Sequence, residues 1–241
     1  MIPLRDDNPT KTTPVVTIGI IVAATVVFIY QLTLGPQAGE QFVYLYGAIP
    51  AVIMGQQTLP REVMALPPSL SLITSMFLHG GPLHLIGNML FLWIFGDNIE
   101  EAMGHVRFIF FYLICGVVAA MSHAFSNPAS VSPMIGASGA ISGVLGAYLL
   151  LYPRARVYTL IPLGFFFWRA HIPASIMLGF WFVLQLISGT SSVGAAGGGV
   201  AWFAHIGGFL AGMALIGFFK HRSVRFFNPP NRRSPRFYTE G

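Results

Sequence analysis

Charged residues are scarce in this sequence. Asp, Glu, Lys and Arg make up 9% of its 241 residues, whereas 54% of the residues are hydrophobic. A soluble domain usually carries about a quarter charged residues, so the composition excludes a soluble enzyme or binding domain for most of the chain. We therefore expect hydrocarbon to surround most of the protein and the chain to form one polytopic membrane domain.

The chain also lacks the cysteine pairs of disulfides and the common sequence motifs of metal sites. Its one cysteine, Cys115, excludes an internal disulfide and a multi-cysteine metal site. The HExxH pattern of zinc proteases is missing from the sequence. We expect neither a metal nor a cofactor, and no nucleic-acid partner.

Six apolar stretches predict membrane-spanning helices, since most of them approach the ~20 residues that cross a bilayer core. They are residues 14–34, 82–99, 106–125, 136–152, 172–188 and 199–219. We expect an all-α polytopic membrane protein built as a six-transmembrane-helix bundle.

The sequence outside the spans divides into segments of different character. A short N-terminal segment, 1–13, precedes a membrane domain at 14–220, and a basic tail, 221–241, follows it. The connector 35–81 is too apolar for a flexible linker, and we expect it to pack against the bilayer surface. The glycine-rich segment 188–199 predicts a loop, and the tail is expected to lie on anionic lipid headgroups.

The basic residues orient the predicted bundle. With six spans both termini share one side, and of the 13 Lys and Arg residues all except Arg61 fall on that side. The positive-inside rule then places both termini in the cytoplasm. We expect a multi-pass protein of the cell membrane, in which the second, fourth and sixth spans begin on the extracytoplasmic side.

Polar residues gather near the starts of these three spans. His84 and Asn88 lie in the second span, Ser138 begins the fourth, and His205 lies a few residues into the sixth. A rise of 1.5 Å per residue places Ser138 and His205 each about 9 Å below the outer surface. Polar groups at such depth usually face each other or a water-filled cavity, so we expect the four side chains to converge.

Small residues explain how Ser138 and His205 can meet. Gly139 and Gly143 are four residues apart in the fourth span, as are Gly208 and Gly212 in the sixth. Such small-xxx-small patterns allow two helix backbones to approach closely in lipid. Together with Gly136, which precedes the serine, these glycines are expected to support the site.

The chemistry that fits these residues is acyl transfer. Serine becomes a nucleophile when a base takes its proton, and His205 can be that base for Ser138. No acidic residue lies in a span at the depth of His205, so we expect a Ser–His dyad whose histidine an aromatic or backbone contact orients. His84 and Asn88 share a helix face and are assigned, with the Ser138 backbone N–H, as oxyanion donors.

Three motifs carry a resemblance to a known family. GASG around Ser138, HGGPLHLIGN ending at Asn88 and AHIGGFLAG containing His205 together resemble the rhomboid intramembrane serine proteases, over about residues 15–220. The resemblance implies a bundle of six transmembrane helices. It also implies a Ser–His site open to the extracytoplasmic side that cleaves single-pass or polytopic transmembrane substrates near their outer ends. In the family, substrates reach the site near the fifth helix, here the region of Phe180–Phe182.

The chain departs from the family pattern in two places. Some members have a tyrosine four residues after the serine, stacked on the histidine, and Ser142 occupies that position here. The sequence therefore leaves open what orients His205, with Trp202 and Phe203 as candidates. The Trp-Arg pair of the first long loop in some members is also missing from residues 35–81.

Other functions and simpler roles remain open at this point. A catalytically inactive relative that binds membrane proteins would be expected to lack the serine or the histidine, whereas a channel or transporter would more often carry a charged residue within a span. The aromatic run 165–168 is interpreted as an interfacial belt, and Cys115 as a packing residue. Glu100 and Glu101 are expected to cap a helix or to pair with Arg107.

Overall fold

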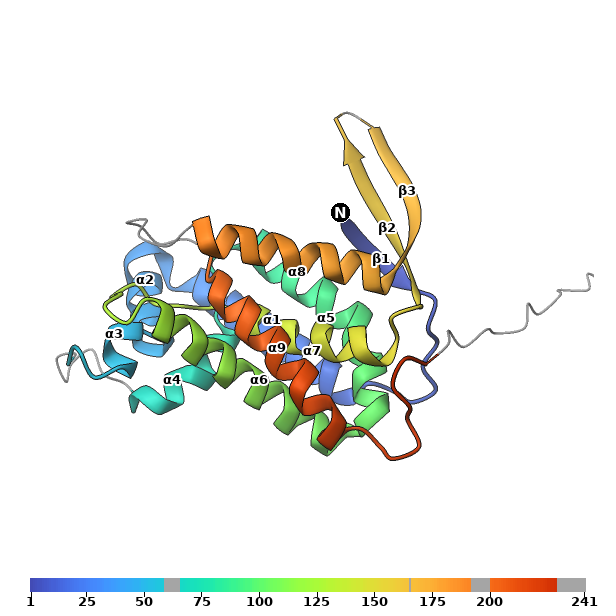
Figure 1. Cartoon of the computed structure of the whole chain (residues 1–241). Helices are drawn as coiled ribbons and strands as arrows, with labels where there is room; N and C mark the ends of the chain where they lie inside the picture. Colours follow the sequence, from blue (N-terminus) through green and yellow to red (C-terminus); the bar gives the residue numbers. More distant parts are fainter. Residues whose placement is uncertain (59–65, 165, 192–199, 229–241) are drawn as a thin grey trace, which may run out of the picture.

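The structure of the chain, a computed structural model, describes residues 1–58, 66–164, 166–191 and 200–228. Within these ranges a small antiparallel sheet adjoins a bundle of helices (Figure 1). In chain order the elements are β1 (Ile2–Asp6), α1 (Val15–Thr33), α2 (Gly35–Tyr46), α3 (Pro50–Ile53), α4 (Pro68–Thr74), the 3₁₀ helix η2 (Ser75–Phe77), α5 (Pro82–Met103), α6 (His105–Ser126), α7 (Ser138–Leu151), β2 (Arg156–Leu163), β3 (Phe166–Pro173), α8 (Ala174–Ser191) and α9 (Trp202–Phe219).

The six predicted apolar stretches form α1, α5, α6, α7, α8 and α9. Among the described residues, α1, α6, α8 and α9 are long and apolar enough to cross a bilayer. Helix α5 meets the same condition together with the segment Pro68–Phe77, from which an 86° bend separates it. Helix α7 is a shorter apolar helix of 14 residues. The predicted fold class, a polytopic helical membrane bundle, is confirmed.

Large apolar side chains are exposed on the outside of the bundle. On α8 the large side chains of Ile176, Phe180, Val183 and Ile187 are exposed, whereas Met177, Leu178 and Gln185 are buried against the other helices. An exposed surface of this composition is expected where the surrounding solvent is lipid. Helix α8 therefore presents most of its circumference to the bilayer.

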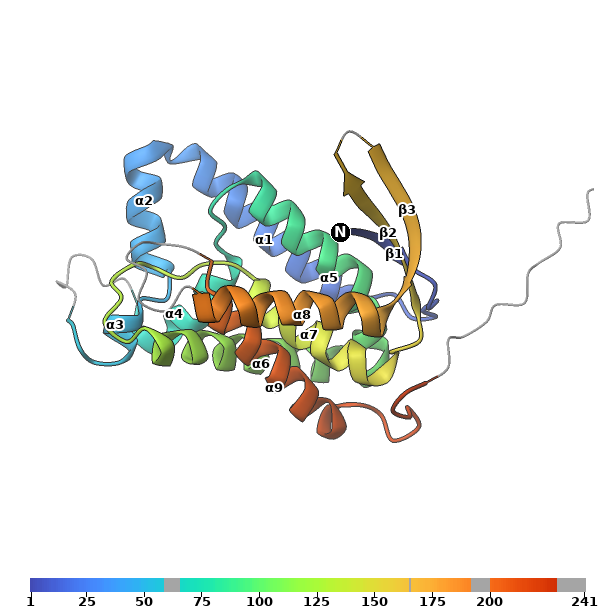
Figure 2. The same ribbon diagram turned by 45° about the horizontal axis from the view of Figure 1, so that its top comes forward.

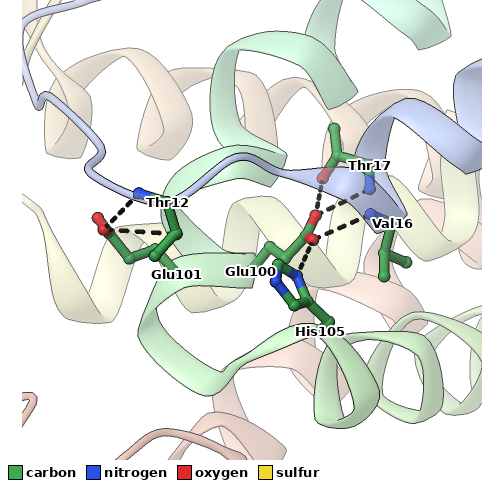
Figure 3. Close-up of polar contacts among 6 residues, drawn as sticks. All are labelled: Thr12, Val16, Thr17, Glu100, Glu101 and His105. Atoms are coloured by element: carbon green, nitrogen blue, oxygen red, sulfur yellow. Dashed lines mark hydrogen bonds and ion pairs between the residues drawn. The ribbon is translucent and has the colours of Figure 1, made fainter.

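A buried carboxylate joins the end of α5 to the start of α1 (Figure 3). Glu100 is 1% exposed and accepts hydrogen bonds from the backbone N–H groups of Val16 and Thr17 at 2.9 and 2.8 Å. Negative charge is stabilising at a helix N-terminus, where such N–H groups lack helical partners. Glu100 also pairs with His105 at 2.6 Å.

Of the two predicted roles for the glutamates, capping holds for Glu100, whereas Glu101 neither caps a helix nor pairs with Arg107. Glu101 accepts hydrogen bonds from the backbone N–H groups of Lys11 and Thr12. Arg107 instead donates to the carbonyl of Phe219, the last residue of α9. Because both carboxylates accept hydrogen bonds from backbone N–H groups of residues 11–17, neither pairs with Arg107.

The three-stranded sheet is the element that the sequence reading missed. Strand β2 pairs antiparallel with β1 on one side and with β3 on the other. The aromatic residues Phe166, Phe167 and Trp168 begin β3 and are exposed. The two views agree that the hairpin of β2 and β3 leaves the bundle beside the start of α8 (Figures 1 and 2).

Backbone hydrogen bonds hold the loop that precedes α7. Ala48 and Met134 form an isolated bridge, with N–H to O distances of 3.0 and 2.8 Å, and the Gly136 N–H donates to the carbonyl of Ser75 at 2.9 Å. Irregular backbone at membrane depth needs such internal partners. The connector 35–81 supplies them through the region of α3 and η2.

Parts of four predicted segments lie outside the described residues. These are residues 59–65 of the connector, 165 of the aromatic run, 192–199 of the glycine-rich loop and 229–241 of the basic tail.

Close backbone contact between α7 and α9 organises the centre of the bundle. A Cβ atom at Gly208 would overlap the carbonyl oxygen of Gly139, and one at Gly212 would overlap that of Gly143. Gly146 meets the backbone of Phe209 in the same way. The glycines of α9 therefore lie directly against the α7 backbone, as predicted. The side-chain positions of Gly139 and Gly143 point instead at Ala119 and Cys115 of α6, so these two glycines also allow α6 to approach α7.

We predict that Gly212→Ala destabilises the protein by about 1–3 kcal/mol, the usual cost of overpacking, because the new methyl group must push α7 and α9 apart. The matched control is Gly19→Ala in α1, where a Cβ atom has nothing within 4 Å. Thermal unfolding in detergent measures both variants. Equal melting temperatures for the two would contradict the proposed role of the contact.

Candidate active site

Ser138 is the first residue of α7. The loop reaches it through Gly136, whose φ of 120° is a backbone conformation that other residues rarely adopt. Ala137, at the N-cap, makes no side-chain capping bond to the first turn. The first N–H groups of any helix lack acceptors within the helix, and at α7 no side chain at the N-cap supplies one. The positive end of the α7 dipole therefore lies beside the Ser138 hydroxyl.

The imidazole of His205 lies directly against this hydroxyl. Its Nε2 is 2.8 Å from Ser138 Oγ, and His205 lies in the first turns of α9, where Gly208 meets Gly139. Both residues lie in the first turns of their helices, α7 and α9, which pack against each other. The glycine contact thus determines the separation of the serine from the histidine.

A residue that the sequence reading missed holds the other side of the ring. Gln185 of α8 is buried, and its Oε1 lies 2.7 Å from His205 Nδ1. The Gln185 amide nitrogen donates to the carbonyl of Trp181 at 3.2 Å, which leaves the amide oxygen facing the histidine. Nδ1 therefore carries the proton, and Nε2 is free to accept one from Ser138.

This contact replaces the orienting group expected from the sequence. Trp202 and Trp181 approach the imidazole with ring centroids 6.2 and 5.9 Å away, but the group that accepts the Nδ1–H hydrogen bond is the amide oxygen of Gln185. Ser142 turns away from the histidine and donates to the carbonyl of Ser138 at 2.6 Å. Gln185 could have been found from the sequence, because it is a polar residue inside the predicted span 172–188. The same criterion identified His84, Asn88, Ser138 and His205.

His84 and Asn88 approach from α5. The N–H of Gly80 donates to His84 Nδ1 at 3.3 Å, so the neutral ring carries its proton on Nε2, the atom nearest to Gly136. Asn88 is buried, and within the described part of the chain its Nδ2 has no hydrogen-bond partner. Two side-chain donors are therefore free beside the turn that leads into Ser138.

The four predicted side chains share one cavity. A space of about 1210 Å³ is lined by His84, Asn88, Ser138 and His205, together with the loop 126–136 and the start of α9. Ser126, Asn127, Ser130 and Ser132 of that loop add polar groups to the lining. The cavity exceeds the ~300–1,000 Å³ of common ligand pockets, and its wall supplies both apolar surface and hydrogen-bonding partners.

The comparison with known proteins now decides the family. A family model described as "Rhomboid domain" matches residues 68–222, more than half of the chain. The chain belongs to the rhomboid family. The expected membership is thereby confirmed, and the matched region of this rhomboid contains α5, α7, α8 and α9, the four helices that supply the site.

Similar curated proteins come from bacteria and from eukaryotes. This rhomboid is 34% identical to "Rhomboid protease GluP" of Bacillus subtilis over 144 residues, which cover 60% of the chain and 25% of the relative. It is also 34% identical to "RHOMBOID-like protein 6, mitochondrial" of Arabidopsis thaliana over 148 residues, 60% of the chain and 41% of the relative. The chain thus spans a quarter to two fifths of the length of these relatives.

We predict that Gly136→Ala destabilises this rhomboid by about 1–3 kcal/mol. The new Cβ atom would lie 2.7 Å from His84 Nε2, on a backbone with φ of 120°. Gly80→Ala is the control on the opposite side of the same ring, because its Cβ atom would lie 3.8 Å from His84 Nδ1. Thermal unfolding in detergent compares them, and a Gly136→Ala variant as stable as Gly80→Ala would argue against a tight turn over His84.

Proposed function

We propose that this rhomboid is an intramembrane serine endopeptidase that cleaves transmembrane protein substrates through a Ser138–His205 dyad. The observation that carries the proposal is the 2.8 Å contact of Ser138 Oγ with His205 Nε2 at the wall of a cavity. A hydroxyl at this distance from a neutral imidazole nitrogen can transfer its proton as it attacks a carbonyl carbon. The relatedness to a bacterial rhomboid protease supports the same chemistry.

The reaction would begin when Ser138 Oγ bonds to the carbonyl carbon of the scissile peptide and His205 Nε2 takes the hydroxyl proton. The negative oxygen that forms would accept hydrogen bonds from Asn88 Nδ2, His84 Nε2–H and the backbone N–H of Ser138. Donors that are already in place stabilise such charge strongly because they need not reorganise during the reaction. Asn88 Nδ2 has no competing partner among the described residues, which suits it to this role.

Collapse of this intermediate would break the peptide C–N bond. The proton on His205 then passes to the leaving amine, and the acyl group stays on Ser138. A water molecule, deprotonated by the same Nε2, hydrolyses the ester and restores the hydroxyl. The polar side chains of the loop 126–136 make the cavity a suitable reservoir for that water.

The proposed orientation places the site toward the extracytoplasmic side of the cell membrane, with both termini in the cytoplasm. Arg154, Arg156 and Arg169 lie between the end of α7 and the start of α8, whereas Ser138 and His205 lie at the beginnings of α7 and α9. The two groups are thus at opposite ends of the bundle. The positive-inside rule assigns the basic end to the cytoplasm.

The dyad is tested by labelling the detergent-solubilised chain with a fluorophosphonate, which reacts with activated serines. We expect labelling of the parent chain, none of Ser138→Ala, and a loss of about 10²–10⁴-fold in labelling rate for His205→Ala. Ser142→Ala is the control, because that hydroxyl faces the Ser138 carbonyl and not the histidine. A folded parent chain that stays unlabelled would instead indicate an inactive rhomboid that binds membrane proteins.

We further predict that Gln185 orients His205 in this reaction. Gln185→Leu removes the acceptor for Nδ1–H and should lower kcat about 2- to 12-fold, equivalent to the 0.5–1.5 kcal/mol of one hydrogen bond, while KM changes little. Gln185→Glu keeps an oxygen toward the ring and should restore much of the rate. Kinetics on a transmembrane substrate in vesicles measure both variants.

The control for Gln185 is Thr190→Val on the same helix, since the Thr190 hydroxyl bonds only to carbonyls of its own turn among the described residues. We expect this variant to cleave at the parental rate. If Gln185→Leu and Thr190→Val cleave equally well, Gln185 has a packing role alone.

A further inference from the structure

The small sheet has two chemically different faces. Paired residues of antiparallel strands point to the same side and the direction alternates along each strand, so the register of β2 with β3 sorts the side chains. One side, here called the apolar face, carries Val157, Thr159, Ile161, Phe166, Trp168, Ala170 and Ile172, with Asp6 of β1 beside the buried Val157. The other, here called the basic face, carries Arg5 and Ile2 of β1 with Arg156, Tyr158, Leu160, Phe167, Arg169 and His171.

The bundle covers only the near half of the apolar face. Val157 and Thr159 are fully buried, and the Thr159 hydroxyl lies 3.7 Å from Met177 Sδ in α8. Farther along the same face Trp168 is 62% exposed and Phe166 is 80% exposed. The helices of the bundle therefore leave the outer part of the apolar face, at Phe166 and Trp168, uncovered.

The arginines of the basic face form no ion pair within the part of the chain that the structure describes. Among the described residues, the one ion pair is that of His105 with Glu100, so none of the arginines on this face is paired with a carboxylate. The Arg5 guanidinium lies over the ring of Tyr158, with 5.6 Å from its carbon to the ring centroid. The nearby carboxylate of Asp7 accepts a hydrogen bond from the backbone N–H of Arg156.

The hairpin runs across the direction of α8. In both views it leaves the bundle at the start of that helix and extends sideways from the helix axis (Figures 1 and 2). Because α8 crosses the bilayer, a hairpin with this direction lies along the membrane surface. The contact of Thr159 with Met177 turns the apolar face toward the bilayer core and the basic face toward the headgroups and the water beyond them.

We propose that the sheet of β1, β2 and β3 is a membrane-surface anchor. Phe166 and Trp168 insert between lipid acyl chains at the level of the headgroups, where aromatic side chains are favoured. The arginines of the basic face are drawn to anionic headgroups. This role is independent of the protease chemistry, and its occupant is the lipid surface rather than a protein.

The anchor is joined directly to the bundle. Strand β3 ends at Pro173 and α8 begins at Ala174, so the start of α8 moves only if the hairpin moves. At the opposite edge of the sheet, Tyr148 of α7 donates a hydrogen bond to Asp6 of β1. The sheet thus connects two helices of the bundle to one patch of the bilayer surface.

Nitroxide labels on adjacent residues test the anchor in the full-length chain reconstituted in vesicles. Trp168→Cys places a label on the apolar face, and Arg169→Cys places one on the basic face. Native Cys115 is fully buried and should remain unlabelled. We expect the label at 168 to be accessible to oxygen, which partitions into lipid, and the label at 169 to be accessible to a water-soluble nickel chelate.

Equal access of both labels to the nickel chelate would overturn the proposal. Spin–spin broadening at 168 that grows with protein density would assign the apolar face to a second copy and overturn it as well. Phe166→Cys and Phe167→Cys repeat the comparison if either of the first variants fails to fold, because they also lie on opposite faces.

Lipid charge tests the second half of the proposal. The label at 168 should lie deeper in vesicles that contain phosphatidylglycerol than in vesicles of phosphatidylcholine alone, and Arg5→Gln together with Arg169→Gln should abolish the difference. An equal depth in the two lipids would show that the basic face does not bind headgroups.

Discussion

The backbone contact of α7 with α9 is the constraint on which the rest of the site depends. Helices in lipid gain little from the hydrophobic effect when they associate, so close van der Waals packing must hold them together. Gly139 and Gly143 of α7 face Gly208 and Gly212 of α9 without intervening side chains. Because Ser138 and His205 lie beside this contact, any widening of it would also lengthen the 2.8 Å hydrogen bond between them.

The polar groups at membrane depth divide into two sets with different consequences. One set forms a continuous line from the Trp181 carbonyl through Gln185 and His205 to Ser138. Satisfied polar groups of this kind are rigid, which suits a base that must keep one tautomer. The other set, represented by Asn88 Nδ2, is buried without a partner among the described residues. An unsatisfied donor costs stability, and its retention beside Ser138 is consistent with a partner that arrives with the substrate.

Much of this arrangement follows from the sequence, and what does not follow has physical reasons. Hydropathy predicts the six apolar helices, and the matched depths of Ser138 and His205 predict that they meet. The small sheet was missed because the aromatic start of β3, Phe166 to Trp168, reads equally well as an interfacial belt. The contact of Glu100 with Val16 and Thr17 spans more than 80 residues, and no local pattern encodes it.

Helix α8 connects the small sheet, the His205 side of the site and the lipid-facing surface of the bundle. Its start is fixed by β3, its middle holds His205 through Gln185, and most of its circumference faces lipid. A displacement of α8 away from α9 would therefore withdraw the Gln185 oxygen from Nδ1 before it disturbed the contact of Ser138 with His205, which α7 and α9 maintain. The histidine would then lose the partner that fixes its tautomer while keeping its distance to the serine. In the proposed mechanism, the position of a lipid-facing helix would therefore determine whether the imidazole is held ready to act as a base.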